Sequence, residues 1–164
     1  MKLKAILSVI WAVACAFVFM TPANAAAAAG QPVVLQFRNA ATGYCLDSDT
    51  GGSVYAKSCG SNNSFQKWNT YRDGNRMMVQ NVATGRCLTG KSQSAWTPVT
   101  EPCDGLKSEQ YWEDWDSAAT KVLLVNNRYK YSVINGSCCD GNGAEIVSLS
   151  THPLVGEPSH TWLL

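Results

Sequence analysis

Asn39-Ala40-Ala41-Thr42-Gly43-Tyr44-Cys45-Leu46 is the stretch that decides the fold, because it recurs as Asn81-Val82-Ala83-Thr84-Gly85-Arg86-Cys87-Leu88. Six of the eight positions are identical. A weaker third copy is Asn135-Gly136-Ser137-Cys138-Cys139, which keeps a glycine two residues before a cysteine. Self-similarity at this period indicates one structural unit that is used several times. The sequence therefore predicts three related units.

Each copy leads to a second landmark, a tryptophan that follows a polar side chain by two residues. The landmarks are Gln66-Lys67-Trp68, Gln110-Tyr111-Trp112 and, in degraded form, His160-Thr161-Trp162. The cysteine and the tryptophan are separated by 23, 25 and 24 residues. The glycines are separated by 42 and then 51 residues, so we expect a longer connection, including 116–120, before the third unit. Three units favour a closed threefold object over an open solenoid.

Within the units, short apolar runs have the composition of β-strands and are bounded by turn residues. The runs are Val33–Phe37, Met77–Asn81 and Val122–Val125, and the turns are Thr42-Gly43, Asp73-Gly74-Asn75, Asp104-Gly105 and Asn135-Gly136. No segment after about residue 30 has a clear helical period in its apolar residues. Many short strands with frequent turns predict an all-β fold, and the threefold repeat favours a closed barrel, which has no sheet edges.

Three Gly-x-Cys motifs, each in register with a Gln-x-Trp motif or its remnant, resemble the ricin-type (R-type) β-trefoil lectin domain family over about residues 33–164. The resemblance implies twelve strands, of which six close a barrel and six form a hairpin cap. It also implies that three tryptophans pack into the core while two glutamines bond nearby backbone. These structural residues are Trp68, Trp112, Trp162, Gln66 and Gln110.

The first thirty residues have the pattern of a secretory signal. Two lysines in Met1–Lys4 precede the apolar run Ala5–Met20, and Ala23-Asn24-Ala25 matches a signal-peptidase site. The run is short for a membrane span of about 20 residues. We expect a signal peptide at 1–25, cleaved between 25 and 30, and a secreted domain at 31–164 with repeats at about 33–74, 75–120 and 121–164.

The charge balance excludes some classes of partner. The chain has 13 basic and 12 acidic side chains, and loss of Lys2 and Lys4 leaves 11 against 12. Such a balance predicts neither nucleic acid nor an anionic membrane as partner.

Six cysteines remain after the signal peptide, and an even set in an exported chain predicts disulfides. Cys45 with Cys59, and Cys87 with Cys103, occupy equivalent places in the first two copies. Each bridge closes a loop of about 15 residues, worth roughly 3 kcal/mol.

In the third copy, Ser150 stands where the partner of Cys138 is expected, and Cys139 stands in the place of Leu46. Cys138 and Cys139 therefore leave three alternatives open: a vicinal disulfide, two free thiols, or a metal site with His152 and His160. The spacing does not match the usual zinc motifs, so we expect no metal.

The resemblance also implies a sugar site. Binding repeats carry an aspartate two residues after the first cysteine, an aromatic platform near the second, and amides before Gln-x-Trp. A carboxylate accepts hydroxyl donors, and a flat ring covers the apolar face of a pyranose. The first copy has Asp47, Asn62 and Asn63, but Lys57 stands at the platform position. Tyr55, two residues earlier on the same strand face, can substitute.

The other two copies depart further from the pattern. The second copy has Thr89 and Glu101 at the aspartate and platform positions, so we expect no site there. The third has Asp140, Asn142 and Ser148. Tyr129 and Tyr131 contribute to the third copy only if the longer connection folds over it. As an alternative, Asp47 and Asp140 only accept hydrogen bonds from turn amides.

The leading hypothesis is a secreted, monomeric, non-catalytic module that binds saccharides or glycans without a cofactor. The alternative is a β-trefoil scaffold that binds or inhibits a partner protein, with Trp96 before Pro98 as a candidate contact. Nothing matches the usual nucleophile, zinc or nucleotide motifs, and the carboxylates of Glu109–Asp116 surround a structural tryptophan, so we expect no enzyme activity. Any catalysis would belong to a separate partner chain.

Overall fold

The structure is a computed structural model that describes residues 31–91, 97–115, 120–139 and 145–164, without the side chains of 134–139 and 145–146. The signal-peptide prediction lies outside these residues. Among them, no helix is long and apolar enough to cross a membrane. The strands are β1 (Val33–Leu35), β2 (Arg38–Asn39), β3 (Cys45–Ser48), β4 (Val54–Lys57), β5 (Trp68–Asp73), β6 (Arg76–Asn81), β7 (Cys87–Thr89), β8 (Val99–Glu101), β9 (Tyr111–Asp114), β10 (Lys121–Val122), β11 (Leu124–Asn126), β12 (Ser132–Cys139), β13 (Glu145–Ser150) and β14 (Trp162–Leu163). Two short 3-10 helices are η1 (Ser64–Gln66) and η2 (Ser108–Gln110).

The all-β expectation is confirmed, and the strands fall into three groups of four. β1 and β2 are two parts of one strand, interrupted at Gln36-Phe37, and β10 and β11 are likewise interrupted at Leu123. Counted in this way, the described residues form twelve strands, four in each repeat.

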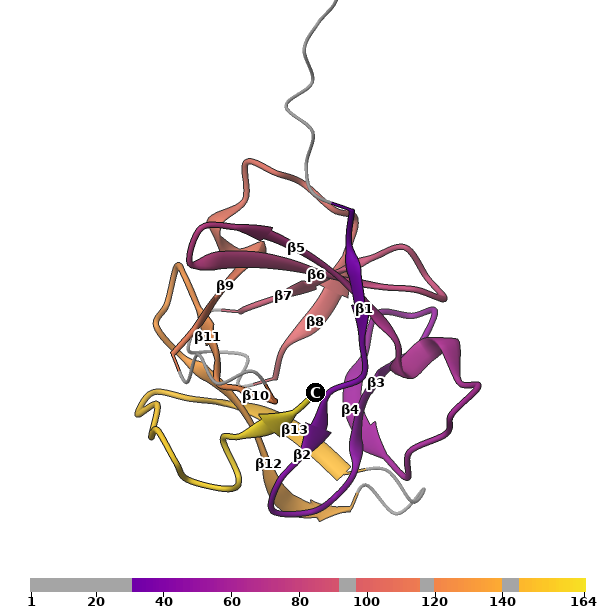
Figure 1. Cartoon of the computed structure of the whole chain (residues 1–164), viewed down its shortest axis with the longest axis vertical. Coiled ribbons are helices and arrows are strands. Elements are labelled where there is room, and N and C mark those ends of the chain that lie inside the picture. Colours follow the sequence, from indigo (N-terminus) through magenta and orange to yellow (C-terminus); the bar gives the residue numbers. More distant parts are fainter. Residues whose placement is uncertain (1–30, 92–96, 116–119, 140–144) are drawn as a thin grey trace, which may run out of the picture.

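Six of these strands close into a barrel. Antiparallel pairing runs from β1 to β5, β6, β9 and β11, and from β10, the other part of the β11 strand, to β14. The ring closes where β14 pairs with β2, which places the C-terminal strand beside the first strand of the domain (Figure 1). A closed ring leaves no long unpaired sheet edge on the barrel.

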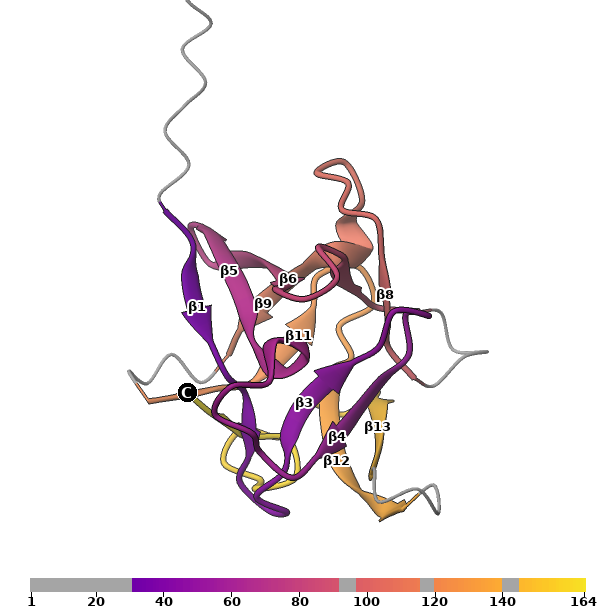
Figure 2. The ribbon, with the colours of Figure 1, turned by 90° about the vertical axis from the view of Figure 1, so that its right-hand side faces the viewer.

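The other six strands form three hairpins, β3–β4, β7–β8 and β12–β13. Neighbouring hairpins also contact one another, because β13 pairs with β4 and a β-bridge joins Ser53 to Val99. Figure 2 shows the β3–β4 hairpin beside β12 and β13. Three of the residues that the sequence predicts to bind a ligand, Asp47, Tyr55 and Lys57, lie on the β3–β4 hairpin.

The three landmark tryptophans occupy the same place in each repeat. Each is fully buried, and each indole nitrogen donates to a backbone carbonyl of a hairpin strand. The acceptors are Leu46 for Trp68 at 3.1 Å, Leu88 for Trp112 at 2.9 Å, and Val133 for Trp162 at 2.9 Å. Tryptophan therefore supplies core volume and satisfies a buried carbonyl with one side chain.

The residue two positions before each tryptophan accepts a backbone N–H in all three repeats. The side-chain oxygens of Gln66 and Gln110 accept the backbone N–H six residues earlier, at 2.8 Å in both repeats. In the third repeat, His160 Nδ1 accepts the N–H of Leu154 at 3.3 Å and lies 2.9 Å from Ser132 Oγ. The ring nitrogen of His160 thus replaces an amide oxygen.

We expect the stability of the fold to depend on the protonation of His160. Burial lowers the pKa of this imidazole below its ordinary value of 6.5, and Glu157 offsets only part of the shift. Because the folded-state pKa is lowered, the stabilisation that the neutral ring gives to the fold is complete above pH 6.5 and is lost as the pH falls below this value. Thermal unfolding at pH 7 and pH 5 should show a larger drop in Tm for the wild type than for His160→Gln. Equal drops would contradict this role.

The turn motif of the third repeat lies earlier in the chain than the sequence predicted. In the first two repeats, the Asn39 and Asn81 side-chain oxygens each accept two turn amides, and Asn126 does the same. Four residues later, Gly43 and Gly85 have φ values of 75° and 68°. The corresponding residue of the third repeat is Lys130, with φ 57°.

The prediction that Asn135–Cys139 is the third copy of the turn motif is therefore wrong. The three asparagines are 42 and 45 residues apart, so no long connection precedes the third repeat. The extra residues lie instead in the β12–β13 hairpin, where β12 alone has eight residues. Ser132, not Cys138, stands at the position of Cys45. The side chains of Cys138 and Cys139 are outside the described part of the structure, so the alternatives for them stay predictions.

Both predicted disulfides are confirmed, Cys45–Cys59 and Cys87–Cys103, with Cα atoms 5.1 and 5.0 Å apart. We expect the double substitution Cys87→Ser/Cys103→Ser to lower the free energy of unfolding by about 3 kcal/mol, because the unfolded chain loses a cross-link. Urea unfolding followed by tryptophan fluorescence measures the change. A loss below about 1 kcal/mol would show that the bridge constrains little.

Candidate functional site

Asp47 on β3 is a buried carboxylate with one oxygen bound and one unused. Only 3% of the residue is exposed. Its Oδ2 accepts Gln66 Nε2 at 3.0 Å and Asn63 Nδ2 at 3.2 Å. Its Oδ1 is equally buried and has no hydrogen-bond partner among the described residues. An unpaired buried acceptor is costly, so this oxygen is suited to a ligand that donates a hydrogen bond.

The electrostatics of Asp47 agree with that geometry. Burial raises the pKa of the carboxyl group, and the interactions with the Gln66 amide, the Ser48 backbone N–H, the Asn63 amide and the Lys57 charge oppose the shift only in part. A carboxyl group in a cavity whose pKa is raised by burial is a candidate functional group.

Asp47 lines a cavity of about 320 Å³, which we call the first-repeat pocket. Tyr55 stands directly opposite Asp47 in the β3–β4 register, so both side chains are on one face of the hairpin. The Lys57 ammonium lies 5.1 Å from the centroid of the Tyr55 ring. The complete lining is Asp47, Ser48, Asp49, Thr50, Tyr55, Lys57, Asn63 and Phe65.

Of the two neighbouring asparagines, only Asn63 reaches the pocket. Asn63 caps η1 by accepting the N–H of Phe65 at 3.1 Å and donates to Asp47 through its other amide atom. Asn62 is exposed and does not line the cavity. Sequence reasoning missed Asp49 and Phe65, although Asp49 has the same strand parity as Asp47 and Phe65 lies inside the Asn63–Gln66 segment.

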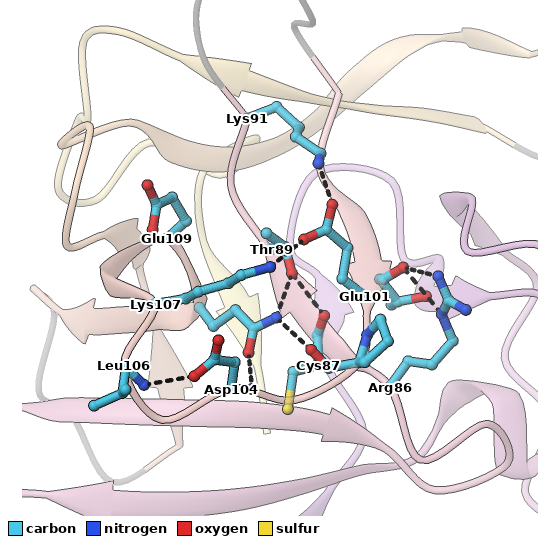
Figure 3. A network of polar contacts seen from close by, with 12 residues as sticks. Arg86, Cys87, Thr89, Lys91, Glu101, Asp104, Leu106, Lys107 and Glu109 are labelled. Carbon is cyan, nitrogen blue, oxygen red and sulfur yellow. Dashed lines mark hydrogen bonds and ion pairs between the residues drawn. The ribbon is translucent and has the colours of Figure 1, made fainter.

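The second repeat has a cavity of about 380 Å³ at the equivalent place, which we call the second-repeat cavity. As expected, Thr89 stands in the position of Asp47, and its hydroxyl is used structurally: it donates to the Cys87 carbonyl and accepts Gln110 Nε2. Glu101 forms ion pairs with Lys91 and Lys107 (Figure 3). The cavity therefore differs chemically from the first-repeat pocket.

In the third repeat, the expected equivalence of Asp140 with Asp47 fails. The β12–β13 register places Ile134 opposite Ser148 where β3 and β4 place Asp47 opposite Tyr55. Asp140 and Asn142 themselves lie outside the described residues. Tyr129 lines the second-repeat cavity instead, stacked on Tyr131 with ring centroids 5.7 Å apart.

A larger cavity of about 820 Å³ lies where the first strand meets β14. It is lined in part by Val34, Arg38 and Leu164, and the Arg38 guanidinium donates to the Gly43 carbonyl at 3.0 Å. The buried side-chain atoms without partners in the described structure are Asp47 Oδ1, Ser48 Oγ and Thr100 Oγ1, none of them in this cavity. Size alone therefore does not identify the site.

The carboxylates around Trp112 do not converge. Glu113 pairs with Lys130 and also accepts the indole N–H of Trp115, whereas Asp114 pairs with Arg72. In the part of the chain that is described, no three His, Cys, Asp or Glu residues are grouped to hold a metal ion. Trp96, the candidate protein contact, is outside the described residues.

Solved structures share the fold at low sequence identity. The designed threefold-symmetric protein ThreeFoil matches with a TM-score of 0.67 at 18% identity, covering 80% of this chain and 97% of that one. The Haemophilus ducreyi cytolethal distending toxin gives 0.65 at 16% identity, covering 80% and 81%. The hemolytic lectin CEL-III gives 0.63 at 20%, covering 82% of this chain and 30% of that one. No curated protein gives a significant match.

The expected β-trefoil is thus confirmed by the barrel, the three hairpins and these neighbours. The family model described as ricin-type beta-trefoil lectin domain matches residues 33–162, which is most of the chain and includes both disulfides and all three buried tryptophans. This chain therefore belongs to the ricin-type β-trefoil lectin domain family.

Proposed function

We propose that this protein is a secreted, non-catalytic saccharide-binding module that uses the first-repeat pocket. The observation that carries the proposal is the unpaired, buried Oδ1 of Asp47 in a cavity that also contains the Tyr55 ring. A sugar hydroxyl supplies the missing donor, and the ring covers the apolar face of the sugar.

Each lining residue has a distinct role in this proposal. Asp47 accepts hydroxyl hydrogens, while Gln66 and Asn63 hold its other oxygen and fix its orientation. Tyr55 is the platform, and Lys57 donates from above the ring to a sugar oxygen. Asn62 stands at the exposed rim and contacts only a longer glycan.

Non-catalytic action and secretion are supported indirectly. Ricin-type domains are carbohydrate-binding modules, and two disulfides are typical of exported proteins. If the module serves catalysis, the enzyme is a separate chain that the module directs to a glycan.

The platform role is tested by a glycan array and by calorimetry on the oxidised mature chain. We expect Tyr55→Ala to lower the affinity for the bound glycan by about tenfold, because apolar contact area is lost. Tyr55→Phe should retain most of the affinity, since the ring remains. Tyr71→Ala removes a tyrosine outside the pocket and serves as the matched control. Absence of binding to any glycan by the wild type would refute the proposal.

A further inference from the structure

The second-repeat cavity repeats the first-repeat pocket with charges changed at matched positions. Glu101 pairs with Cys87 in the hairpin register as Lys57 pairs with Cys45, so a carboxylate replaces an ammonium. Lys107 precedes η2 as Asn63 precedes η1. Lys91 follows Thr89 by two residues, as Asp49 follows Asp47. The two sites therefore occupy the same place in the fold but offer different groups.

Their hydrogen-bonding capacities are opposite. The first-repeat pocket offers an unused acceptor, Asp47 Oδ1, whereas the hydroxyl of Thr89 is already engaged. The second-repeat cavity offers donors, because the ammonium groups of Lys91 and Lys107 converge on Glu101 (Figure 3). Each ammonium carries three N–H donors, so each can also donate to a ligand. A ligand that binds these two ammonium groups must offer hydrogen-bond acceptors.

The charged residues that line the second-repeat cavity are Lys91 and Lys107, with two ammonium groups, and Glu101 and Glu109, with two carboxylates. An adjoining cavity of about 310 Å³ shares Lys91 and Glu101 and adds Arg86 to its lining. The Arg86 guanidinium donates to the carbonyl of Thr100 at 2.7 and 3.0 Å, and a carbonyl does not neutralise its charge. In Figure 3 the Glu109 carboxylate lies apart from the Lys91–Glu101–Lys107 cluster. Within that cluster two ammonium groups therefore face a single carboxylate, and Arg86 adds a third cation from the adjoining cavity.

The cavity also has an aromatic wall. Tyr129 lines it from the third repeat and is held in place by its neighbours: its N–H donates to Asn126 Oδ1 at 3.2 Å, and its ring stacks on Tyr131. Asn126 in turn donates to the Glu109 carbonyl at 2.8 Å. A ring fixed in this way offers a flat apolar surface beside the two ammonium groups.

We propose that the second-repeat cavity binds the anionic group, a carboxylate or a sulfate, of an acidic saccharide between Lys91 and Lys107, with the sugar ring against Tyr129. Glu101 keeps the two ammonium groups together in the free protein and competes with the ligand for them. The inference adds a second site and a second ligand class to the proposed function.

The probes are trigalacturonate, its methyl ester and a sulfated galactan oligosaccharide, titrated into ¹⁵N-labelled mature chain. We expect the amide signals of Thr89, Gly90 and Lys107 to shift with trigalacturonate and to stay unchanged with the ester, which has the same sugars without charge. The sulfated probe shows whether sulfate replaces carboxylate. The affinity should fall steeply with salt, because the attraction between charges is screened.

Three substitutions are expected to change the affinity for trigalacturonate in different ways. We expect Lys107→Gln to weaken the binding of trigalacturonate by about tenfold, which is the scale of one charge-assisted hydrogen bond. Lys67→Gln, which removes the same charge outside the cavity, should leave the affinity unchanged. Glu101→Gln should tighten binding, an effect that damage to the fold cannot produce. Equal affinity for acid and ester, or weaker binding by Glu101→Gln, would overturn the anion site, the latter by showing that Glu101 itself accepts the sugar.

Failure here is distinguishable from failure of the proposed function. Asp47→Asn should weaken neutral-glycan binding by about a hundredfold and leave trigalacturonate binding intact, because Asp47 lies in a different repeat. Loss of both by Asp47→Asn would mean that only the first-repeat pocket binds, and would overturn the second site.

Discussion

Asp47→Asn should reduce glycan affinity at the first-repeat pocket by about a hundredfold while leaving the fold intact. Asparagine keeps a side-chain oxygen that can accept Gln66 and Asn63, the two donors to Oδ2. The unused Oδ1 becomes an NH₂ group, which presents donors to a sugar hydroxyl that needs an acceptor. Hydrogen bonds to a charged group are worth about 1.5–3 kcal/mol, hence the size of the effect.

The same substitution should not lower the free energy of unfolding at pH 7. Because burial raises the pKa of Asp47 in the folded state, the ionised carboxylate disfavours folding, and wild-type stability gains from its protonation as the pH falls through the folded-state pKa. Asparagine removes the charge that burial penalises. Urea unfolding at pH 7, beside calorimetry with the glycan, measures both quantities on one preparation.

Asp104→Asn is the matched control, because Asp104 is a turn carboxylate that accepts the N–H of Leu106 at 2.9 Å outside the first-repeat pocket. It should bind glycan like the wild type. If Asp47→Asn bound normally and lost stability, Asp47 would be a structural turn residue, and the saccharide proposal would lose its main support.

Trp112→Ala should have the largest effect on stability. Truncation of a buried tryptophan costs about 3–5 kcal/mol. It also leaves the Leu88 carbonyl, which accepts the indole N–H at 2.9 Å, without its partner. Domains of this size are stable by about 5–15 kcal/mol, so we expect a marginally folded or unfolded chain.

Two further variants separate volume from hydrogen bonding in that prediction. Trp112→Phe keeps most of the apolar volume and loses the donor, so its loss should be smaller than that of alanine. Trp115→Ala removes a tryptophan that is 44% exposed and should cost less than about 1 kcal/mol. Far-UV circular dichroism with urea unfolding compares all three. Similar losses for Trp112→Ala and Trp115→Ala would contradict the assigned core.

The first two repeats were predictable because local chemistry fixes them. A glycine with positive φ before a cysteine, and a tryptophan at a fixed distance, are visible in sequence since few residues can replace them. Strand parity placed Tyr55 on the face of Asp47, because side chains alternate along a strand. The pairing of the cysteines followed from their equivalent places.

The turn motif of the third repeat was misplaced because the turn lacks those signals. Lys130 stands where Gly43 and Gly85 stand, and Ser132 stands where the first cysteine was expected. Only Asn126 keeps its role, and a lone asparagine is a weak signal. Asn135-Gly136-Ser137-Cys138 matches the motif better but lies inside a hairpin of another length, so the local pattern indicated the wrong segment.

The sequence by itself determined the all-β class, the threefold repeat, both disulfides and the candidate carboxylate Asp47, because each depends on spacing along the chain. Only the tertiary structure decided which oxygen of Asp47 is unpaired and that Tyr129, from the third repeat, completes the second-repeat cavity. It also decided that Lys91 and Lys107 meet at Glu101. Tyr129 reaches the second-repeat cavity from another repeat, which barrel closure brings beside it. The contacts of Asp47 and of Glu101 form within one repeat, where the packing of a hairpin against the segment before the tryptophan decides which atoms meet. No local sequence pattern records either kind of contact.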